Sequence, residues 1–147
     1  MSVLSSRFFS RAVRIGALLL GLSLAAGVQA GDFAVIVNKA NTARADKEAI
    51  AKIYMGQTKS WSDGTPVAAV DLPEDNPARV SFSTELLQKS VDNVKSLWAQ
   101  LVFSGQALPP KRVGSDDEVK KFVAANKGAV GYVRASSVDD SVKVALK

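Results

Sequence analysis

The chain has 147 residues, with 19 Lys plus Arg, 14 Asp plus Glu and a formal net charge of +5 at neutral pH. It contains no cysteine and no histidine, which excludes disulfides and thiolate nucleophiles and removes the commonest general base and metal ligand near neutral pH. No catalytic or metal-binding motif of the remaining residue types is visible, so we expect no enzyme, no cofactor and no metal site.

The first 30 residues have the layout of a cleavable export signal. Their basic part holds three arginines and no acidic residue, namely Arg7, Arg11 and Arg14. An apolar run from Ile15 to Ala26 follows, and small residues end at Ala30, after which we expect cleavage. Because this run is shorter than the about 20 residues that span a bilayer, we expect a soluble periplasmic protein that begins at Gly31.

The mature chain is nearly neutral and long enough for one domain. Cleavage removes three arginines and no acidic residue, which leaves 16 basic and 14 acidic residues and a charge near +2. The lysines are scattered and not interleaved with aromatic residues, so we expect no nucleic-acid partner. Residues 31–147 supply 117 positions, enough for one hydrophobic core and too few for two domains.

The first elements that the sequence predicts are a strand, a loop and a helix. The β-branched apolar run Phe33–Val37 is typical of a strand buried on both faces. Polar residues 38–44 indicate a loop. A helix starts near Asp46, because apolar residues then recur at spacings of three and four, namely Ile50, Ile53 and Tyr54. Gly56 ends this helix, as glycine commonly does.

A second strand and a second helix follow. Ser62-Asp63-Gly64 predicts a turn, and Val67–Val70 predicts a buried strand. Asn76-Pro77 is a strong helix start, because Asn accepts a backbone hydrogen bond there and Pro lacks an amide that would have no partner. We expect this helix to run to about Gln88.

The third predicted helix begins at Ser90 and ends at Gly105. We expect its apolar stripe to be buried, and this stripe consists of Val94, Leu97, Trp98 and Leu101. Aromatic residues on apolar faces or beside turns are also expected to pack in the core, namely Tyr54, Trp61, Trp98, Phe103 and Phe122.

The last part of the chain predicts one helix and two strands. Residues 115–118 form a capping box, in which Ser115 bonds forward and Glu118 bonds back, and the helix continues through Val123. The strands are Ala129–Arg134 and Val142–Leu146. Strands that alternate with helices predict an α/β fold, here a three-layer sandwich with a mainly parallel, mixed sheet.

Two separated segments resemble one protein family. Ile53-Tyr54-Met55-Gly56 followed by Trp61, and residues 128–133 (Gly-Ala-Val-Gly-Tyr-Val), are similar to segments in the second lobe of the phosphate-binding protein of bacterial phosphate ABC transporters. The resemblance covers most of the chain after residue 31 and implies one lobe of a type 2 periplasmic binding protein. It also implies an anion held between two lobes by an arginine, hydroxyls and backbone amides at a helix N-terminus.

The resemblance fails at the residues that hold phosphate in that family. There, an arginine and a Ser-Gly-Thr segment precede a helix with an internal Phe. With Phe82 as the reference point, Leu72 stands in place of the arginine, and residues 76–78 (Asn-Pro-Ala) stand in place of Ser-Gly-Thr. Glu74 and Asp75 add negative charge beside the helix start, which would repel an anion.

Five residues remain as candidate ligand contacts. Asn76 and Arg79 keep a polar side chain and a positive charge in the first helical turn. Lys39, Asn41 and Thr42 follow the first strand, and we expect them at the carboxyl edge of the sheet, where ligands of open α/β folds bind. The alternatives are a surface arginine and a solvated loop. The family's first lobe has no counterpart in these residues, so a homodimer or another protein would have to supply the second wall of a cleft.

Two hypotheses follow. The first is a periplasmic solute-binding protein, similar to the phosphate-binding component of an ABC transporter, that binds phosphate or another oxyanion and acts with an inner-membrane permease. The second is a lobe that has lost ligand binding and serves as an envelope interaction or adaptor protein, for instance for a membrane sensor. The two family segments favour the first hypothesis, and the missing arginine and Ser-Gly-Thr favour the second.

Overall fold

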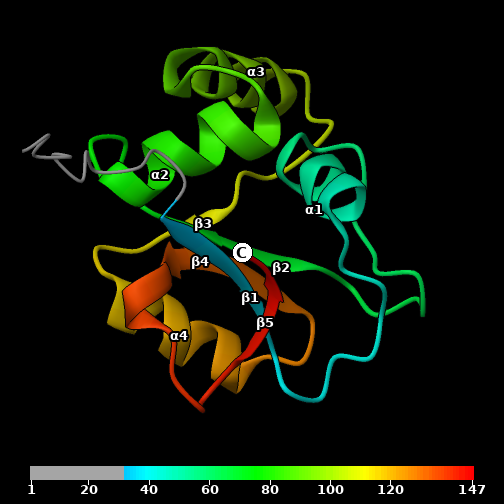
Figure 1. Ribbon diagram of the computed structural model, residues 1–147. Helices are drawn as coiled ribbons and strands as arrows, with labels where there is room; N and C mark the ends of the chain where they lie inside the picture. Colours follow the sequence, from blue (N-terminus) through cyan, green and yellow to red (C-terminus); the bar gives the residue numbers. More distant parts are fainter. Residues whose placement is uncertain (1–31) are drawn as a thin grey trace, which may run out of the picture.

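The computed structural model describes residues 32–147, so the predicted export signal lies outside the described residues. The elements follow in the order β1 (Phe33–Val37), α1 (Lys47–Tyr54), β2 (Ala68–Asp71), α2 (Pro77–Ser81), the π-helix η1 (Phe82–Leu87), α3 (Val91–Phe103), β3 (Lys111–Arg112), α4 (Asp116–Ala125), β4 (Ala129–Arg134), the 3-10 helix η2 (Ala135–Ser137) and β5 (Lys143–Leu146). Figure 1 shows the sheet in the middle of the molecule, between the helices.

The strands form one mixed sheet in the order β3-β2-β4-β1-β5. β2 runs parallel to β3 and β4, whereas β1 runs antiparallel to its two neighbours, β4 and β5. In the register of β1 and β4, Phe33 pairs with Arg134 and Val37 pairs with Val130. The carboxyl end of β1 therefore lies at the edge of the sheet where β2 and β4 begin.

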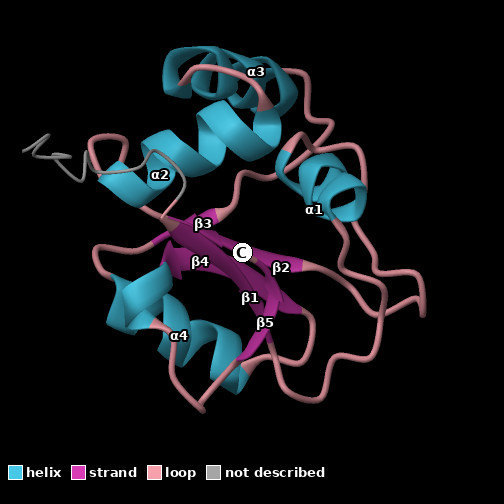
Figure 2. Cartoon of the chain, in the orientation of Figure 1, coloured by secondary structure: helices cyan, strands magenta, loops and turns pink. Residues whose placement is uncertain are grey.

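Helices cover both faces of the sheet, which confirms the predicted α/β fold. α1, α2 and α3 lie on one face and α4 lies on the other (Figure 2). All five residues of β1 are buried, as the continuous apolar run predicted. The first five residues of β4 are also buried, and its last residue, Arg134, is exposed. The core is centred on these two strands, because both of their faces are covered by helices or by other segments of the same chain.

The predicted helix starts are confirmed by their capping bonds. Side-chain oxygens accept hydrogen bonds of 2.9 to 3.3 Å from backbone amides two or three residues ahead, at Asp46, Asn76, Ser90 and Ser115. Glu118 bonds back as expected of a capping box, but its partner is the amide of Gly114 and not that of Ser115. The glycines that end α1 and α3 have positive φ angles, 73° at Gly56 and 71° at Gly105.

The second predicted helix is divided into two kinds of helix. Its α-helical part is α2, and the π-helix η1 continues from Phe82 to Leu87. Gln88 then ends the segment in a left-handed conformation with φ of 55°. Ser83 closes this end, since its hydroxyl donates a 2.8 Å hydrogen bond to the backbone oxygen of Lys89. The wide turn places Phe82, Leu86 and Leu87 in the core.

The predicted buried stripe of α3 and the expected place of Phe103 are largely wrong. Only Val94 of the stripe is buried, and Leu97, Trp98 and Leu101 are half-buried. Phe103, expected in the core, is 95% exposed. The reason is the position of α3, which lies outermost in its layer and packs on η1 instead of on the sheet (Figure 1).

Candidate functional site

The five predicted ligand residues do not form one site. Asn76 and Arg79 follow β2 and lie at its carboxyl edge of the sheet. Lys39, Asn41 and Thr42 follow β1, which is antiparallel to β4, and β4 is parallel to β2. The expectation that this loop lies at the carboxyl edge of the parallel strands is therefore wrong. The loop lies at the opposite edge, beside the start of β5.

Arg79 is the charged candidate at the carboxyl edge of β2, and it is bound to internal partners. It is 4% exposed, which contradicts the alternative of a surface arginine. Its Nη1 lies 2.6 Å from Oδ2 of Asp71 and 2.9 Å from the backbone oxygen of Leu72. An external anion at this edge would have to compete with the carboxylate of Asp71 for the same guanidinium group.

Two of the groups at the helix start beside Arg79 cannot bind an anion. Oδ1 of Asn76 accepts a 2.9 Å hydrogen bond from the amide of Ala78, and Pro77 has no amide to donate. Glu74 lies in the preceding turn, where a hydrogen bond from Lys95 lowers the pKa of its carboxyl group. Lys95 at 3.2 Å and Arg112 at 3.6 Å both form ion pairs with this carboxylate, so its charge is paired with two cations.

Two buried tyrosines complete the polar cluster behind the end of β2. The hydroxyl of Tyr132 donates a hydrogen bond to Oδ1 of Asp71, and the hydroxyl of Tyr54 donates one of 2.7 Å to the backbone oxygen of Val70. The ring of Tyr132 is stacked on Phe82 with centroids 4.0 Å apart. Burial, and then the negative charge of Asp71, raises the pKa of both tyrosines well above the usual range. Both are therefore neutral donors. Tyr132 holds the carboxylate of Asp71, and Tyr54 holds the backbone of β2 at Val70.

The loop at the opposite edge divides into structural and accessible residues. Nδ2 of Asn38 donates hydrogen bonds of 2.8 and 3.0 Å to the backbone oxygens of Val123 and Ala124, which ties the loop to the end of α4. Asn41 is 3% exposed, and its Oδ1 accepts a hydrogen bond from Ala43. Within residues 32–147, Nδ2 of Asn41 has no hydrogen-bond partner. Of the three predicted ligand residues in this loop, Lys39 and Thr42 are exposed, and a ligand can reach them.

The two family-like segments meet in space, although they are far apart in the sequence. Nε1 of Trp61 donates a 2.9 Å hydrogen bond to the backbone oxygen of Gly128, and the hydroxyl of Tyr54 lies 3.3 Å from the backbone oxygen of Val130. A Cβ atom on Gly131 would lie 2.6 Å from a side-chain atom of Val119. These segments hold α1, β4 and α4 together, so their role is in packing.

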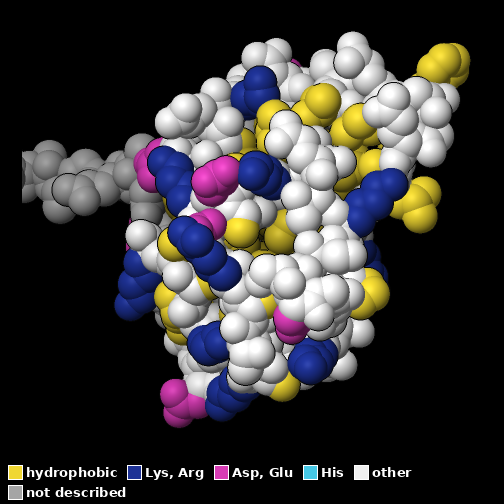
Figure 3. All heavy atoms as spheres, turned by 90° about the vertical axis from the view of Figure 1, so that its right-hand side faces the viewer, with side chains coloured by type: hydrophobic (Ala, Val, Ile, Leu, Met, Phe, Trp, Pro, Cys, Tyr) yellow, Lys and Arg dark blue, Asp and Glu magenta, His cyan; other side chains and the backbone are white. Residues whose placement is uncertain are grey.

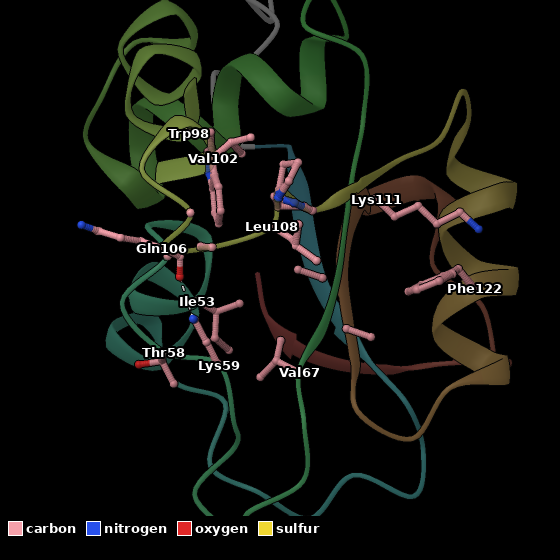
Figure 4. Close-up of a pocket in the computed structure, with 17 residues that line it drawn as sticks. Ile53, Thr58, Lys59, Val67, Trp98, Val102, Gln106, Leu108, Lys111 and Phe122 are labelled. Atoms are coloured by element: carbon pink, nitrogen blue, oxygen red, sulfur yellow. Dashed lines mark hydrogen bonds between the residues drawn. The ribbon is translucent and has the colours of Figure 1, made fainter. Parts of the chain in front are cut away.

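A groove of about 570 Å³ opens beside the first residues of β2. β3 pairs only with Val70 and Asp71, because the two residues before it, Pro109 and Pro110, cannot donate to a ladder. We call this cavity the β2 groove, and its larger lining side chains are Ile53, Val67, Trp98, Val102, Leu108 and Phe122. Figure 4 shows Trp98 and Val102 on one side of it and Phe122 with Lys111 on the other.

The surface around the β2 groove exposes several large apolar side chains. Val102 is 45% exposed, Leu108 is 86% exposed and Phe103, next to Val102, is 95% exposed. Figure 3 shows hydrophobic side chains gathered in the upper right of the face it presents, with Lys and Arg side chains close by. Exposed apolar side chains gathered in this way are typical of a binding surface.

The sequence analysis missed Asp71 and the β2 groove. Asp71 is a single polar residue at the end of an apolar strand, and no local sequence pattern links it to Arg79, which follows eight residues later. The prolines that shorten β3 were visible, but the exposure of Phe103 depends on where α3 packs. Among residues 32–147, no cluster of acidic residues is suited to a metal ion, and no helix has the length and apolar character needed to cross a bilayer.

Comparisons with known proteins agree with this fold. A family model described as a PBP superfamily domain matches residues 25–146. The chain is similar to an ABC-type phosphate transport receptor from Vibrio cholerae, with 26% identity and a TM-score of 0.59 over 77% of this chain and 44% of that one. It is also similar in fold to a phosphate ABC transporter substrate-binding protein with bound phosphate from Clostridium perfringens, with 21% identity and a TM-score of 0.62 over 79% and 46%. The chain thus spans under half the length of both proteins, and no curated protein matches it.

Proposed function

Because the chain belongs to the family of PBP superfamily domains, we propose that it works in the periplasm as a binding lobe of the solute-binding-protein type, next to an inner-membrane permease or sensor. The layout of residues 1–30 supports export. The lack of histidine, cysteine and any visible catalytic motif supports a role in binding without catalysis.

The proposed mode of action is contact with a protein partner, without capture of phosphate at the carboxyl end of β2, beside Asn76 and Arg79, which we call the β2 edge. The observation that carries this proposal is the buried pair of Arg79 and Asp71, 2.6 Å apart, which occupies the guanidinium group with an internal carboxylate. The apolar surface around Val102 and Phe103 supports a protein partner, because such surfaces are costly to leave in water.

Cell fractionation and cross-linking test this role. The chain carrying a C-terminal tag is produced in its own host, and intact cells are treated with a cross-linker before fractionation. We expect a periplasmic protein whose mass corresponds to a start at Gly31, cross-linked to the same inner-membrane protein in every replicate. A chain that keeps residues 1–30 and stays in the cytoplasm would contradict the proposal.

A second candidate function is the binding of phosphate or another oxyanion. The 26% identity to the phosphate transport receptor from Vibrio cholerae favours it. The exposed Lys39 and Thr42 offer a positive charge and a hydroxyl at the other edge of the sheet, and a homodimer or another protein would supply the second wall.

Calorimetric titration separates the two functions. Phosphate is added to the purified protein, with sulfate as the control anion and Lys39→Ala as the variant. Saturable heat with phosphate that is lost in Lys39→Ala would establish the second function. We expect no saturable heat with either anion, provided that circular dichroism shows the protein to be folded.

A further inference from the structure

We infer that the β2 groove binds an extended segment of a partner protein, which inserts an apolar side chain into the groove and places an acidic side chain beside Lys59 or Lys111. The inference rests on the proposed docking role and specifies the surface and the chemistry of the partner. The groove itself follows from the sequence, because Pro109 and Pro110 keep β3 short and leave Ala68 and Ala69 without a strand partner on that side.

Part of the groove is lined by small residues, which leave space for an incoming side chain. Ala68 and Ala69 lie at its base, and Gly56, Gly105 and Ala107 line it as well. Larger apolar side chains from α1, α3 and α4 form the sides, so the groove is an apolar cavity that no further element of residues 32–147 covers. Its volume of about 570 Å³ can accommodate a large aliphatic or aromatic side chain.

A protein segment fits this surface better than a small molecule. A small ligand inside the groove would leave Phe103 in water, because Phe103 lies outside the lining and is 95% exposed. Leu108 lines the groove and is still 86% exposed. A chain that crosses the groove would cover both residues, and apolar anchors surrounded by a larger contact area are typical of protein interfaces.

The charges at the groove indicate an acidic partner. Lys59 and Lys111 are the charged residues of its lining, and neither forms an ion pair with a carboxylate in residues 32–147. Nζ of Lys59 donates a 2.7 Å hydrogen bond to the backbone oxygen of Gln106 at the rim, and Nζ of Lys111 lies 5.1 Å from the ring centroid of Phe122 (Figure 4). The ammonium group of Lys59 is therefore held at the rim of the groove and that of Lys111 beside Phe122, and both favour a carboxylate on the partner.

A second copy of the chain fits less well. It would bring a second pair of Lys59 and Lys111 to the interface, and the groove lining contains no carboxylate to neutralise them. Like charges brought together in an interface oppose association. We therefore assign the groove to a segment of a different protein, which carries Asp or Glu next to a Phe, Leu or similar residue.

Peptide selection tests the inference with a defined probe. A library of random peptides displayed on phage is selected against the purified protein, and the enriched peptides are synthesised with a fluorescent label for titration. We expect them to share an apolar residue adjacent to Asp or Glu. Val102→Asp, at a half-exposed position on α3, should weaken their binding at least tenfold, and Lys111→Glu should do the same.

The matched control is Lys121→Glu, which makes the same charge change on an exposed part of α4 outside the groove lining. Binding to this variant should change less than twofold. The inference would be overturned if no peptide were enriched, or if neither Val102→Asp nor Lys111→Glu changed the affinity of the enriched peptides. A wild-type dimer in sedimentation that Val102→Asp dissociates would overturn it as well, since the occupant would then be a second copy. Neither result bears on export or on cross-linking to a membrane protein, so the proposed function is tested separately.

Discussion

At the scale of single residues, the pair of Arg79 and Asp71 decides what the β2 edge can bind. The side chains are 5% and 14% exposed, so each charge is desolvated and depends on the other. Tyr132 and the backbone oxygen of Leu72 add hydrogen bonds to the pair. Because Nη1 of Arg79 is bound to internal partners, an anion at this position would have to compete with Asp71 for it.

Replacement of the arginine should destabilise the protein strongly. Arg79→Met leaves the carboxylate of Asp71 largely buried without its cation, which we expect to lower the free energy of unfolding by about 3 kcal/mol. Urea denaturation measures this change. Arg44→Met is the control, because the side chain of Arg44 is 82% exposed, and it should cost less than about 0.5 kcal/mol. Equal small effects of both substitutions would show that the buried pair is not formed.

The tyrosines predict a clear dependence on alkaline pH. The chain has two tyrosines, Tyr54 and Tyr132, and burial raises the pKa of both above the ordinary value of about 10. Below that value both states keep their protons. Above it the unfolded chain loses protons that the folded protein retains, so the free energy of unfolding falls as pH rises.

Tyrosinate absorbance and circular dichroism, followed together during an alkaline titration, check this prediction. The tyrosinate signal should develop only with the loss of native dichroism, in one transition. Tyr132→Phe should halve the absorbance change. Tyrosinate absorbance near pH 10 in a protein with native dichroism would contradict the burial of these hydroxyls.

At the scale of elements, the sequence predicted what is coded locally. Helix starts at Asp46, Asn76, Ser90 and Ser115 were predictable, because a capping bond joins residues two or three apart. The direction of β1 in the sheet and the π-helical turn at Phe82 depend on distant partners, and no local pattern indicated them. The buried pair of Arg79 and Asp71 escaped prediction for the same reason.

A substitution at Asn76 separates capping from ligand binding. The side-chain oxygen of Asn76 caps α2, so Asn76→Ala should cost about 1 kcal/mol in the free energy of unfolding. Asn76→Asp keeps the capping oxygen and should remain within a few tenths of a kcal/mol of the wild type. Chemical denaturation measures both. A large loss of stability in Asn76→Asp would mean that the amide nitrogen of Asn76 has a role that the structure does not assign to it.

The close contact of β4 with its neighbours explains one glycine of the family-like segment. Gly131→Ala would place a Cβ atom 2.6 Å from Val119 and 2.7 Å from Val70, and this overpacking should cost about 1–3 kcal/mol. Thermal unfolding followed by circular dichroism measures the loss. Gly114→Ala is the matched control, because its nearest contact would be 3.4 Å away, and it should change stability by less than about 0.5 kcal/mol.

At the scale of the whole molecule, the antiparallel β1 separates the two sets of candidate residues. Lys39 and Thr42 lie at one edge of the sheet, while Arg79 lies at the other and is bound internally. The sequence predicted the α/β fold and the family but placed both sets at one edge, because strand direction cannot be read from an apolar run. Within residues 32–147, the β2 groove is bordered by the exposed apolar side chains of Val102, Phe103 and Leu108, which is why we assign docking to it.

Amide NMR spectra recorded during a phosphate titration show whether the β2 edge holds phosphate. We expect the amide signals of Leu72, Asn76 and Arg79 to keep their positions up to millimolar phosphate. Small shifts that sulfate reproduces would be an effect of ionic strength. Saturable shifts at these three amides with phosphate and not with sulfate would show that phosphate binds at the β2 edge, and the second candidate function would then hold.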